Sequence, residues 1–231
     1  MKGQYFVADA RDAIAVKQIS RAITAWEPLL SLKFTRGESL YGGILVSYGL
    51  SVGEPTMLTF RDRHQEMNSG DAIVLVPSVR VDTKPTADVL WICHEGLAPE
   101  HLRDPVGLAL GFERFPFAGG AEDHSICGRR RQVLPTTDLR YRVQYHFVEI
   151  ENAEPHMHDD MVELYYVLSG EGEVRVGPSQ DQLTGVHIRA GQLLAIGPGL
   201  FHVPSNGLGM CIWFLHTEMA HRRRVREAAA R

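Results

Sequence analysis

The chain contains 231 residues, of which 44% are hydrophobic and 23% are charged, and its formal net charge at pH 7 is −4. This balance is typical of an ordinary globular protein, and the negative charge gives no general attraction to nucleic acid or to an anionic membrane surface. Residues 1–20 lack the basic start and apolar run of a signal peptide, and no segment approaches the roughly 18 apolar residues of a membrane span. We therefore expect a cytoplasmic protein.

Short apolar segments separated by Gly, Pro, Asn and Asp make up most of the chain. Val, Ile, Tyr, Phe and Trp dominate these segments, and such residues favour strands. The expected strands cover 42–50, 71–77, 88–94, 141–150, 162–170 and 209–216. Two helices are expected, near 9–25 and over the tail at 217–231, whereas 95–140 is predicted to be a connector with one or two strands of its own. Regular strands with turns between them predict an all-β barrel or sandwich.

The three cysteines, Cys93, Cys127 and Cys211, lie far apart and form no CxxC pair. Their odd number and wide spacing exclude a disulfide framework of the kind that stabilises small secreted proteins. We expect buried or incidental thiols at these positions.

The two halves of the chain share a spacing pattern that indicates an internal duplication. Gly70 and Pro77 bracket an apolar strand in the first half, and Gly191 and Pro198 bracket another in the second, at an offset of about 121 residues. In both halves a loop and then a tryptophan-containing apolar strand follow. Self-similarity at a fixed offset predicts two barrels, one in each half.

A histidine pair in the second half is the clearest candidate for chemistry. His156 and His158 are two residues apart, so on a strand both imidazoles point to the same face and can meet one ion. Glu163 follows five residues later, and a turn after His158 would allow the next strand to aim its carboxylate at that ion. Tyr165 should share the face of Glu163, because residues i and i+2 of a strand lie on the same side.

A second segment, 191–206, supplies another histidine. Pro198 and Gly199 make a bend there, and His202 comes just after it. Neutral imidazole suits zinc, copper, iron and nickel, and a carboxylate extends the range to manganese. Three histidines and one carboxylate leave positions open on a six-coordinate ion, which separates a working site from a closed structural one.

Together the two segments resemble the two cupin motifs, G-x5-H-x-H-x3,4-E-x6-G and G-x5-P-x-G-x2-H-x3-N. The residues that match are His156, His158, Glu163, Gly170, Gly191, Gly199, His202 and Asn206. The chain departs from the motifs at Ile150, which stands in place of the opening glycine, and at Gly197, which stands in place of the proline. Neither departure removes a ligand.

The resemblance implies an all-β bicupin, with two tandem cupin jelly-roll (double-stranded β-helix) barrels and few short helices. It also implies one divalent metal ion, Fe(II) in preference to Mn, Ni or Zn, with the ligands His156, His158, Glu163 and His202. Cupins often form dimers, so we expect a homodimer.

We expect a degenerate N-terminal barrel without metal at 1–110, and a metal-binding barrel with a short helical tail at 111–231. Aligning the halves at the offset of 121 residues leaves no metal ligand in the first half. The residues at the four ligand positions are then Thr35, Gly37, Gly42 or Gly43, and Val81. The first barrel would support packing, dimerise or shape the entrance to the other site.

Two further side chains are candidates for a role beside the metal. Tyr165 is the predicted catalytic residue, because a phenol that faces the metal can donate a proton or bind an oxyanion; alternatively its ring only lines the barrel. His146 would point inward on an uninterrupted strand, and we expect a hydrogen-bonded core histidine there in preference to a substrate contact. His64 is expected to be a solvated loop residue.

These features predict a metal-dependent cupin enzyme that acts on a small organic molecule, with a non-haem oxygenase (dioxygenase) preferred. One alternative is a metal-dependent isomerase or lyase acting on a sugar or an enolisable acid, because the same ion can stabilise an enediolate. Another is a non-enzymatic cupin that senses a small molecule. The expected partner is a small-molecule substrate, with no nucleic acid and no membrane, since one basic cluster in the tail is weak support for DNA binding.

Overall fold

The computed structural model describes residues 4–28, 30–36, 40–41, 46–51, 55–60, 63–75, 80–83, 88–94, 112–134 and 143–230. Within these ranges the protein is mostly β, with two α-helices and the short 3₁₀ helix η3 (Phe117–Gly119). The predicted all-β fold is confirmed. Neither α-helix in the described ranges has the length and apolar character needed to cross a membrane.

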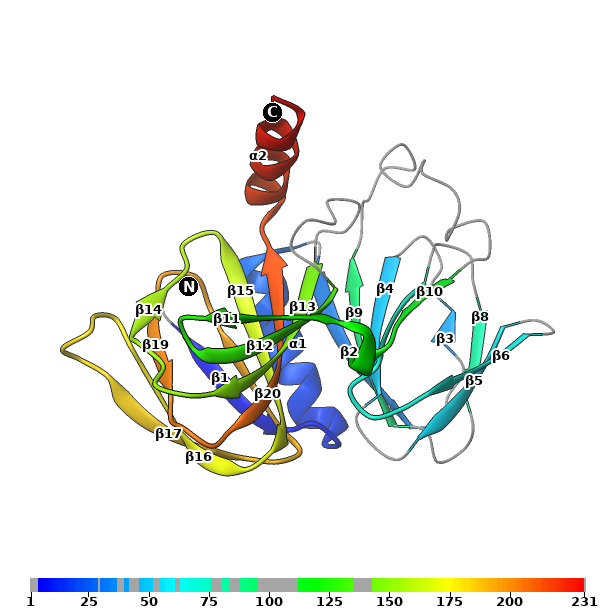
Figure 1. Cartoon of the computed structure of the whole chain (residues 1–231), viewed down its shortest axis with the longest axis horizontal. Coiled ribbons are helices and arrows are strands. Elements are labelled where there is room, and N and C mark those ends of the chain that lie inside the picture. Colours follow the sequence, from blue (N-terminus) through cyan, green and yellow to red (C-terminus); the bar gives the residue numbers. More distant parts are fainter. Residues whose placement is uncertain are drawn as a thin grey trace. The chain divides into compact units, whose positions relative to one another are not determined.

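One compact unit comprises Met1–Asp9, Ala25–Glu27 and Gly120–Arg231. Its larger sheet contains, in spatial order, β1 (Tyr5–Asp9), β18 (Gln192–Ile196), β15 (Met161–Ser169), β20 (Gly209–His216), β13 (Val143–Ile150), β12 (Gly128–Leu134) and β11 (Ala121–Ser125). Its smaller sheet contains β14 (His156–Met157), β19 (Phe201–Pro204), β16 (Glu171–Gly177) and β17 (Thr184–Arg189). Neighbouring strands are antiparallel, and the two sheets form facing layers of this unit, as in a jelly roll (Figure 1).

The other unit comprises Ala10–Thr24 and Pro28–Gly119. Its five-stranded sheet contains, in spatial order, β10 (Phe112–Phe115), β7 (Ala72–Leu75), β4 (Val46–Ser51), β9 (Asp88–His94) and β2 (Leu30–Arg36). Its four-stranded sheet contains β3 (Leu40–Tyr41), β8 (Arg80–Thr83), β5 (Thr56–Phe60) and β6 (Arg63–Met67). The strand Tyr5–Asp9 therefore belongs to the same unit as the C-terminal half, a grouping that the expected division at residue 110 does not contain.

The two units share one strand order. The sheet β10-β7-β4-β9-β2 corresponds strand by strand to β1-β18-β15-β20-β13, and β3-β8-β5-β6 corresponds to β14-β19-β16-β17. This repeated order agrees with the duplication that the glycine and proline spacing indicates.

The strand register corrects the residue expected opposite His156. His156 pairs with His202 between β14 and β19, and the equivalent pair between β3 and β8 is Leu40 with Val81. Val81 is therefore equivalent to His202, as predicted. The residue equivalent to His156 is Leu40 and not the predicted Thr35. The prediction was wrong because the halves differ in the length of the segments between strands, so one fixed offset cannot align them throughout.

The position equivalent to Glu163 is likewise different from the expected one. Glu163 is flanked by Ile196 and Phe214, and the residues 121 positions earlier, Leu75 and Cys93, flank Ser47. Ser47 therefore replaces the predicted Gly42 or Gly43, which lie outside the described residues together with Gly37. Leucine, serine and valine at the three described positions are not the residue types that usually bind divalent metals.

In the unit that contains Gly120–Arg231, the hydrophobic core lies between the two sheets. Tyr165 and Val167 of β15 belong to this core, together with apolar side chains from strands of both sheets. Leu164 and Tyr166 are buried on the other face of β15. The alternation agrees with the prediction that Glu163 and Tyr165 share the inward face.

Both predicted helices are present; the first begins later than 9 and ends one residue beyond 25, and the second lies within 217–231. α1 (Ala13–Trp26) begins after Asp12, whose carboxylate accepts hydrogen bonds from two backbone N–H groups of the first turn. α2 (Glu218–Ala229) begins after Thr217, whose hydroxyl accepts a hydrogen bond from the third residue of the helix. In each case a side-chain oxygen satisfies N–H groups that have no partner within the helix.

The segment expected to be a connector contains more strand than predicted. Three strands, β10, β11 and β12, lie within its described part at 112–134. β11 and β12 pair antiparallel, and Asp123 and Glu122 form ion pairs with Arg130 and Arg131 across the pair. Opposite charges that face each other across strands stabilise a sheet, so a charge-rich composition does not exclude strand structure here.

Candidate metal centre

The strands β14 and β19 bring two of the predicted ligands side by side. His156 and His202 are direct partners in the antiparallel register, and their Nε2 atoms lie 3.1 Å apart. The bend before β19 is tied to the same region, because the N–H of Gly199 donates a hydrogen bond to the carbonyl oxygen of His158 at 2.8 Å. Gly199 has a φ of 81°, a left-handed conformation that favours glycine.

Glu163 reaches this pair from the central strand β15. Its Oε1 lies 2.8 Å from Nε2 of His158, and its Oε2 lies 3.1 Å from Nε2 of His202. One ligand atom from each of His156, His158, Glu163 and His202 lies within 4.8 Å of the others, so the four residues could hold one metal ion. Glu163 and His202 are buried, and His156 and His158 are half-buried. The structure thus brings together all four residues that the sequence singled out.

The orientation of the imidazoles fits a cation at the centre of the cluster. Nδ1 of His156 lies 2.8 Å from the carbonyl oxygen of Glu154, and Nδ1 of His202 lies 3.1 Å from that of Leu200. A carbonyl can only accept, so Nδ1 carries the proton and the lone pair of Nε2 points to the centre. Oε1 of Glu163 is also buried and makes no hydrogen bond, although the His158 ring is close. Converging lone pairs beside a carboxylate repel one another unless a cation lies between them.

The electrostatics keep the carboxylate charged. Burial by itself would raise the pKa of Glu163, but the imidazoles of His202 and His158 outweigh it and hold the pKa well below its ordinary value. Burial lowers the pKa of His156, and the neighbouring His202 lowers it further. Burial also acts to lower the pKa of His158, but its interaction with the carboxylate of Glu163, whose Oε1 lies 2.8 Å from Nε2, prevails and raises it. An ionised carboxylate surrounded by imidazoles is the donor set that a divalent ion of borderline softness prefers.

Two side chains contact the cluster without belonging to it. The phenol of Tyr165 donates a hydrogen bond to Oε2 of Glu163 at 2.5 Å, and burial, followed by the charge of Glu163, raises its pKa well above the ordinary value. Sγ of Cys127 lies 3.8 Å from Nε2 of His156, and burial raises the pKa of this thiol to about 12. Tyr165 is therefore a neutral donor to a predicted ligand, and its catalytic role stays a prediction.

A cavity of about 240 Å³ adjoins the cluster. Three of the predicted ligands and Tyr165 line it, together with side chains from β12, β13 and β20 and the turn between β11 and β12. The lining residues are Ser125, Ile126, Cys127, Arg130, Gln144, His146, Val148, His156, His158, Met161, Glu163, Tyr165, Ile212 and Phe214. The cavity is smaller than the roughly 300–1,000 Å³ of most ligand pockets, so it suits a small molecule.

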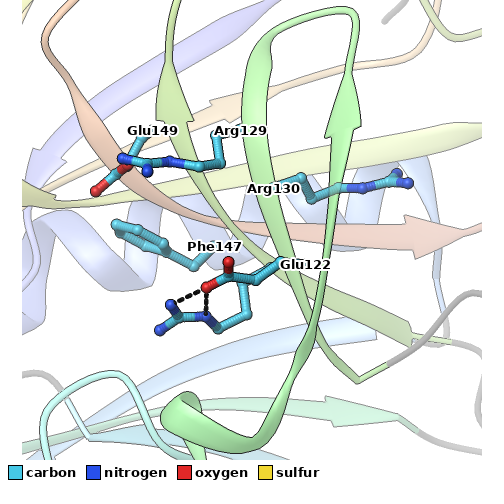
Figure 2. Close-up of a pocket in the computed structure, with 6 residues that line it drawn as sticks. Glu122, Arg129, Arg130, Phe147 and Glu149 are labelled. Atoms are coloured by element: carbon cyan, nitrogen blue, oxygen red, sulfur yellow. Dashed lines mark hydrogen bonds and ion pairs between the residues drawn. The ribbon is translucent and has the colours of Figure 1, made fainter.

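A second, smaller pocket of about 130 Å³ involves the other face of β12 and β13. Figure 2 shows Glu122, Arg129, Phe147 and Glu149 gathered there, while Arg130 points the other way. Arg129 pairs with Glu149, and Glu122 pairs with Arg131. Because these charges are already matched across neighbouring strands, we assign no chemistry to this pocket.

The other histidines show one clear departure from expectation. His146 is buried, as predicted, but neither ring nitrogen has a hydrogen-bond partner among the described residues, so the prediction of a hydrogen-bonded core histidine is wrong. His64 is exposed, as expected, but it lies in β6 and not in a loop, and it contacts the hydroxyl of Thr59. Sequence reasoning also missed Arg130, a cavity-lining residue in a segment that composition marked as a connector. The alternation of side chains along β12 would have revealed it only if that strand had been recognised.

Comparison of sequences finds one family. The family model described as Cupin matches residues 152–224, the segment that holds the four clustered residues. No curated protein matches the sequence of this chain.

Comparison of folds finds solved structures of low sequence identity. Streptomyces albus HEPD, solved with 2-hydroxyethylphosphonate and Fe(II), has a TM-score of 0.63 at 12% identity, and the match covers 87% of this chain and 71% of that one. Escherichia coli Ylba has a TM-score of 0.62 at 9% identity, with coverage of 93% and 91%. Bacillus subtilis oxalate decarboxylase, a protein with Mn(II) centres, has a TM-score of 0.59 at 12% identity, with coverage of 94% and 74%. At such identities the similarity establishes a cupin-like fold and leaves the reaction open.

Proposed function

We propose that this protein is a metal-dependent enzyme that acts on a small organic molecule, and that its reaction is an oxygenase reaction of the dioxygenase type. The observation that carries the proposal is the cluster of three imidazoles and one carboxylate next to a small, largely apolar cavity. A closed structural site would need no such cavity, whereas a catalytic site must admit a substrate beside its metal.

The four clustered residues would hold the ion. His156 and His202 present Nε2 because backbone carbonyls fix their Nδ1 atoms, and Glu163 contributes an ionised carboxylate. A divalent ion bound there would supply Lewis acidity and open coordination positions. Fe(II) is our preferred ion, and Mn, Ni and Zn also suit this donor set.

Tyr165 would act on the reaction through Glu163. Its O–H bonds to Oε2 of that residue at 2.5 Å and so restricts the rotation of the carboxylate. Residues that orient metal ligands in this way tune both the affinity for the ion and its reactivity. Tyr165 also lines the cavity, where it stays protonated at neutral pH.

Two solved neighbours support metal-dependent chemistry for a chain with this fold. Streptomyces albus HEPD holds Fe(II) together with its substrate, and Bacillus subtilis oxalate decarboxylase has Mn(II) centres. The second neighbour, as a decarboxylase, favours an alternative for this chain, namely lyase or isomerase chemistry on an enolisable acid. In that version the ion would stabilise negative charge on an oxygen atom of the substrate, and no molecular oxygen would be consumed.

Oxygen uptake tests the proposal. Protein purified without oxygen and without nickel affinity resin would be analysed for metal, and then supplied with oxygen and a panel of diols, thiols and enols. We expect substrate-dependent oxygen consumption by the wild type and none by Glu163→Gln. The matched control is Glu171→Gln, which removes an exposed carboxylate that pairs with His187 at the surface and should leave uptake unchanged.

Other outcomes of the same experiment would support one of the alternative functions. Turnover at the same rate without oxygen would contradict the oxygenase version, and solvent deuterium in the recovered substrate would support isomerase or lyase chemistry. Saturable binding without any turnover would support a small-molecule sensor.

A further inference from the structure

His146 of β13 is a buried imidazole with no bonding partner. It is 1% exposed, and neither Nδ1 nor Nε2 makes a hydrogen bond to any described residue. Buried polar groups in native proteins are nearly always paired, because an unpaired one loses its hydration without compensation. Two unpaired nitrogens on one ring therefore call for a functional explanation.

The position of His146 supplies that explanation. Its strand alternates so that Gln144, His146 and Val148 line the cavity beside the metal cluster. The ring rests edge-on against Phe214, with centroids 5.1 Å apart, and the same phenyl group contacts His158 at 6.1 Å. The imidazole thus belongs to the wall of a space that also borders the predicted metal ligands.

The chemistry of the ring limits what it can bind. Burial, followed by the charge of Arg130, lowers the pKa of His146 to about 4. At neutral pH the imidazole is uncharged, so one nitrogen donates a hydrogen bond and the other accepts one. A neutral imidazole therefore binds a hydroxyl group, which can both donate and accept a hydrogen bond, better than it binds an anion.

Outside the metal cluster, Arg130 is the one charged residue among the described residues that line the cavity, and its charge is neutralised by an ion pair with Asp123. Arg130 donates from Nε to Oδ1 of Asp123 at 2.7 Å and forms a second bond to Oδ2, which Gln132 also contacts. This pairing leaves Arg130 with little positive charge to attract a phosphate or carboxylate, so within the wall only the metal ion would attract an anion.

Most of the remaining wall is apolar, although Ser125 and Gln144 also line it. Ile126, Val148, Met161, Ile212 and Phe214 contribute hydrocarbon surface to a volume of about 240 Å³. Such a wall favours a carbon body of a few to about ten heavy atoms, held mainly by apolar contact.

We propose that His146 is a substrate-binding residue, and that the substrate is a small uncharged molecule with an apolar carbon body and a hydroxyl group that hydrogen-bonds to this imidazole. The inference rests on the proposed function, since it takes the cavity beside the metal cluster as the substrate site. It adds the chemical class of substrate, which the metal ligands alone do not specify.

Phenol and toluene are matched probes, because they differ in replacing a hydroxyl by a methyl group. Binding of each to the Zn(II)-loaded protein would be measured by calorimetry for the wild type and for His146→Phe, which keeps an aromatic ring and removes both nitrogens. We expect His146→Phe to weaken phenol binding about tenfold and to change toluene binding less than about twofold, as loss of one hydrogen bond predicts. His187→Phe, at an exposed site, is the matched control and should alter neither affinity.

Three results would overturn the inference. These are an equal effect of His146→Phe on both probes, an unchanged affinity for phenol, and the absence of saturable phenol binding by the wild type. A second measurement does not depend on a variant that folds: phenol, and not toluene, should shift the ring ¹⁵N resonances of His146 in the wild type. Since neither experiment needs turnover, failure of oxygen uptake would count against the proposed function and leave this inference standing.

Discussion

His156 and His202 are direct register partners on β14 and β19, with their Nε2 atoms 3.1 Å apart and both Nδ1 atoms held by backbone carbonyls. Two segments separated by more than forty residues in the sequence thus place two lone pairs face to face. Without a cation between them the two Nε2 lone pairs repel each other, and the buried carboxylate of Glu163 adds negative charge at the same point. The fold therefore prepares this point for a metal ion before one binds.

Tyr165→Phe should weaken metal binding while leaving the fold intact. The change removes the hydroxyl that bonds to Glu163, and loss of a group that orients a metal ligand typically costs about 10–100-fold in affinity. Titration of metal-free protein with Zn(II) would measure the effect. Tyr145→Phe is the control, because it removes a buried hydroxyl that donates to Cys211, away from the cluster.

In urea unfolding of the metal-free protein, Tyr145→Phe should lose about 1 kcal/mol of stability, and Tyr165→Phe about 1.5–3 kcal/mol because its hydroxyl bonds to a charged carboxylate. Only Tyr165→Phe should lose metal affinity. Equal metal affinities in the two variants would show that the Tyr165 contact has no positioning role.

Gly199→Ala should disturb the metal site through the backbone. Alanine at a φ of 81° costs about 1–2 kcal/mol, and relief of that strain would move the N–H that bonds to the carbonyl of His158. We expect lower stability and a several-fold loss of metal affinity. Gly207→Ala is the matched control, because Gly207 has a φ of 86° and open space where an added Cβ would lie, so it should lose stability alone. Wild-type metal affinity in Gly199→Ala would show that this bend does not position the cluster.

His146 predicts a specific pH dependence of stability. Its folded-state pKa of about 4 lies below the ordinary value of 6.5, so between these values the unfolded chain binds more protons than the folded one. Stability therefore falls as the pH is lowered through this window. The free energy of unfolding of the metal-free wild type, relative to that of His146→Phe, should drop by about 2–3 kcal/mol from pH 7.5 to pH 4.5.

Denaturant unfolding at a series of pH values would measure this difference, and comparison with the variant cancels the titration of the four clustered residues. A constant difference between wild type and His146→Phe would mean that the ring titrates normally and is not desolvated.

The candidate ligands could be predicted because their spacing is local. His156 lies in β14 and His158 directly follows that strand, Glu163 is the third residue of β15, and His202 follows a glycine bend that the sequence makes visible. The tryptophan-containing strands β9 and β20 were predicted at their observed bounds for the same reason, since their apolar runs are continuous.

Features that depend on distant partners could not be predicted. β1 joins the sheet by pairing Tyr5 with Ile196, and nothing in the short segment identifies a partner so far along the chain. The charges of β12 become favourable only once Asp123 and Glu122 lie opposite them. The unpaired ring of His146 is invisible in sequence, because an absent hydrogen bond is a property of the packed surroundings.

The most direct test of the metal centre is the metal content of the protein purified without oxygen and without nickel resin. We expect close to one divalent ion per chain in the wild type, less than about a tenth of that in Glu163→Gln, and an unchanged value in Glu171→Gln. Retention of the full ion in Glu163→Gln, or a wild-type protein that takes up no divalent ion even when titrated, would contradict the assignment of a metal ion to these four residues.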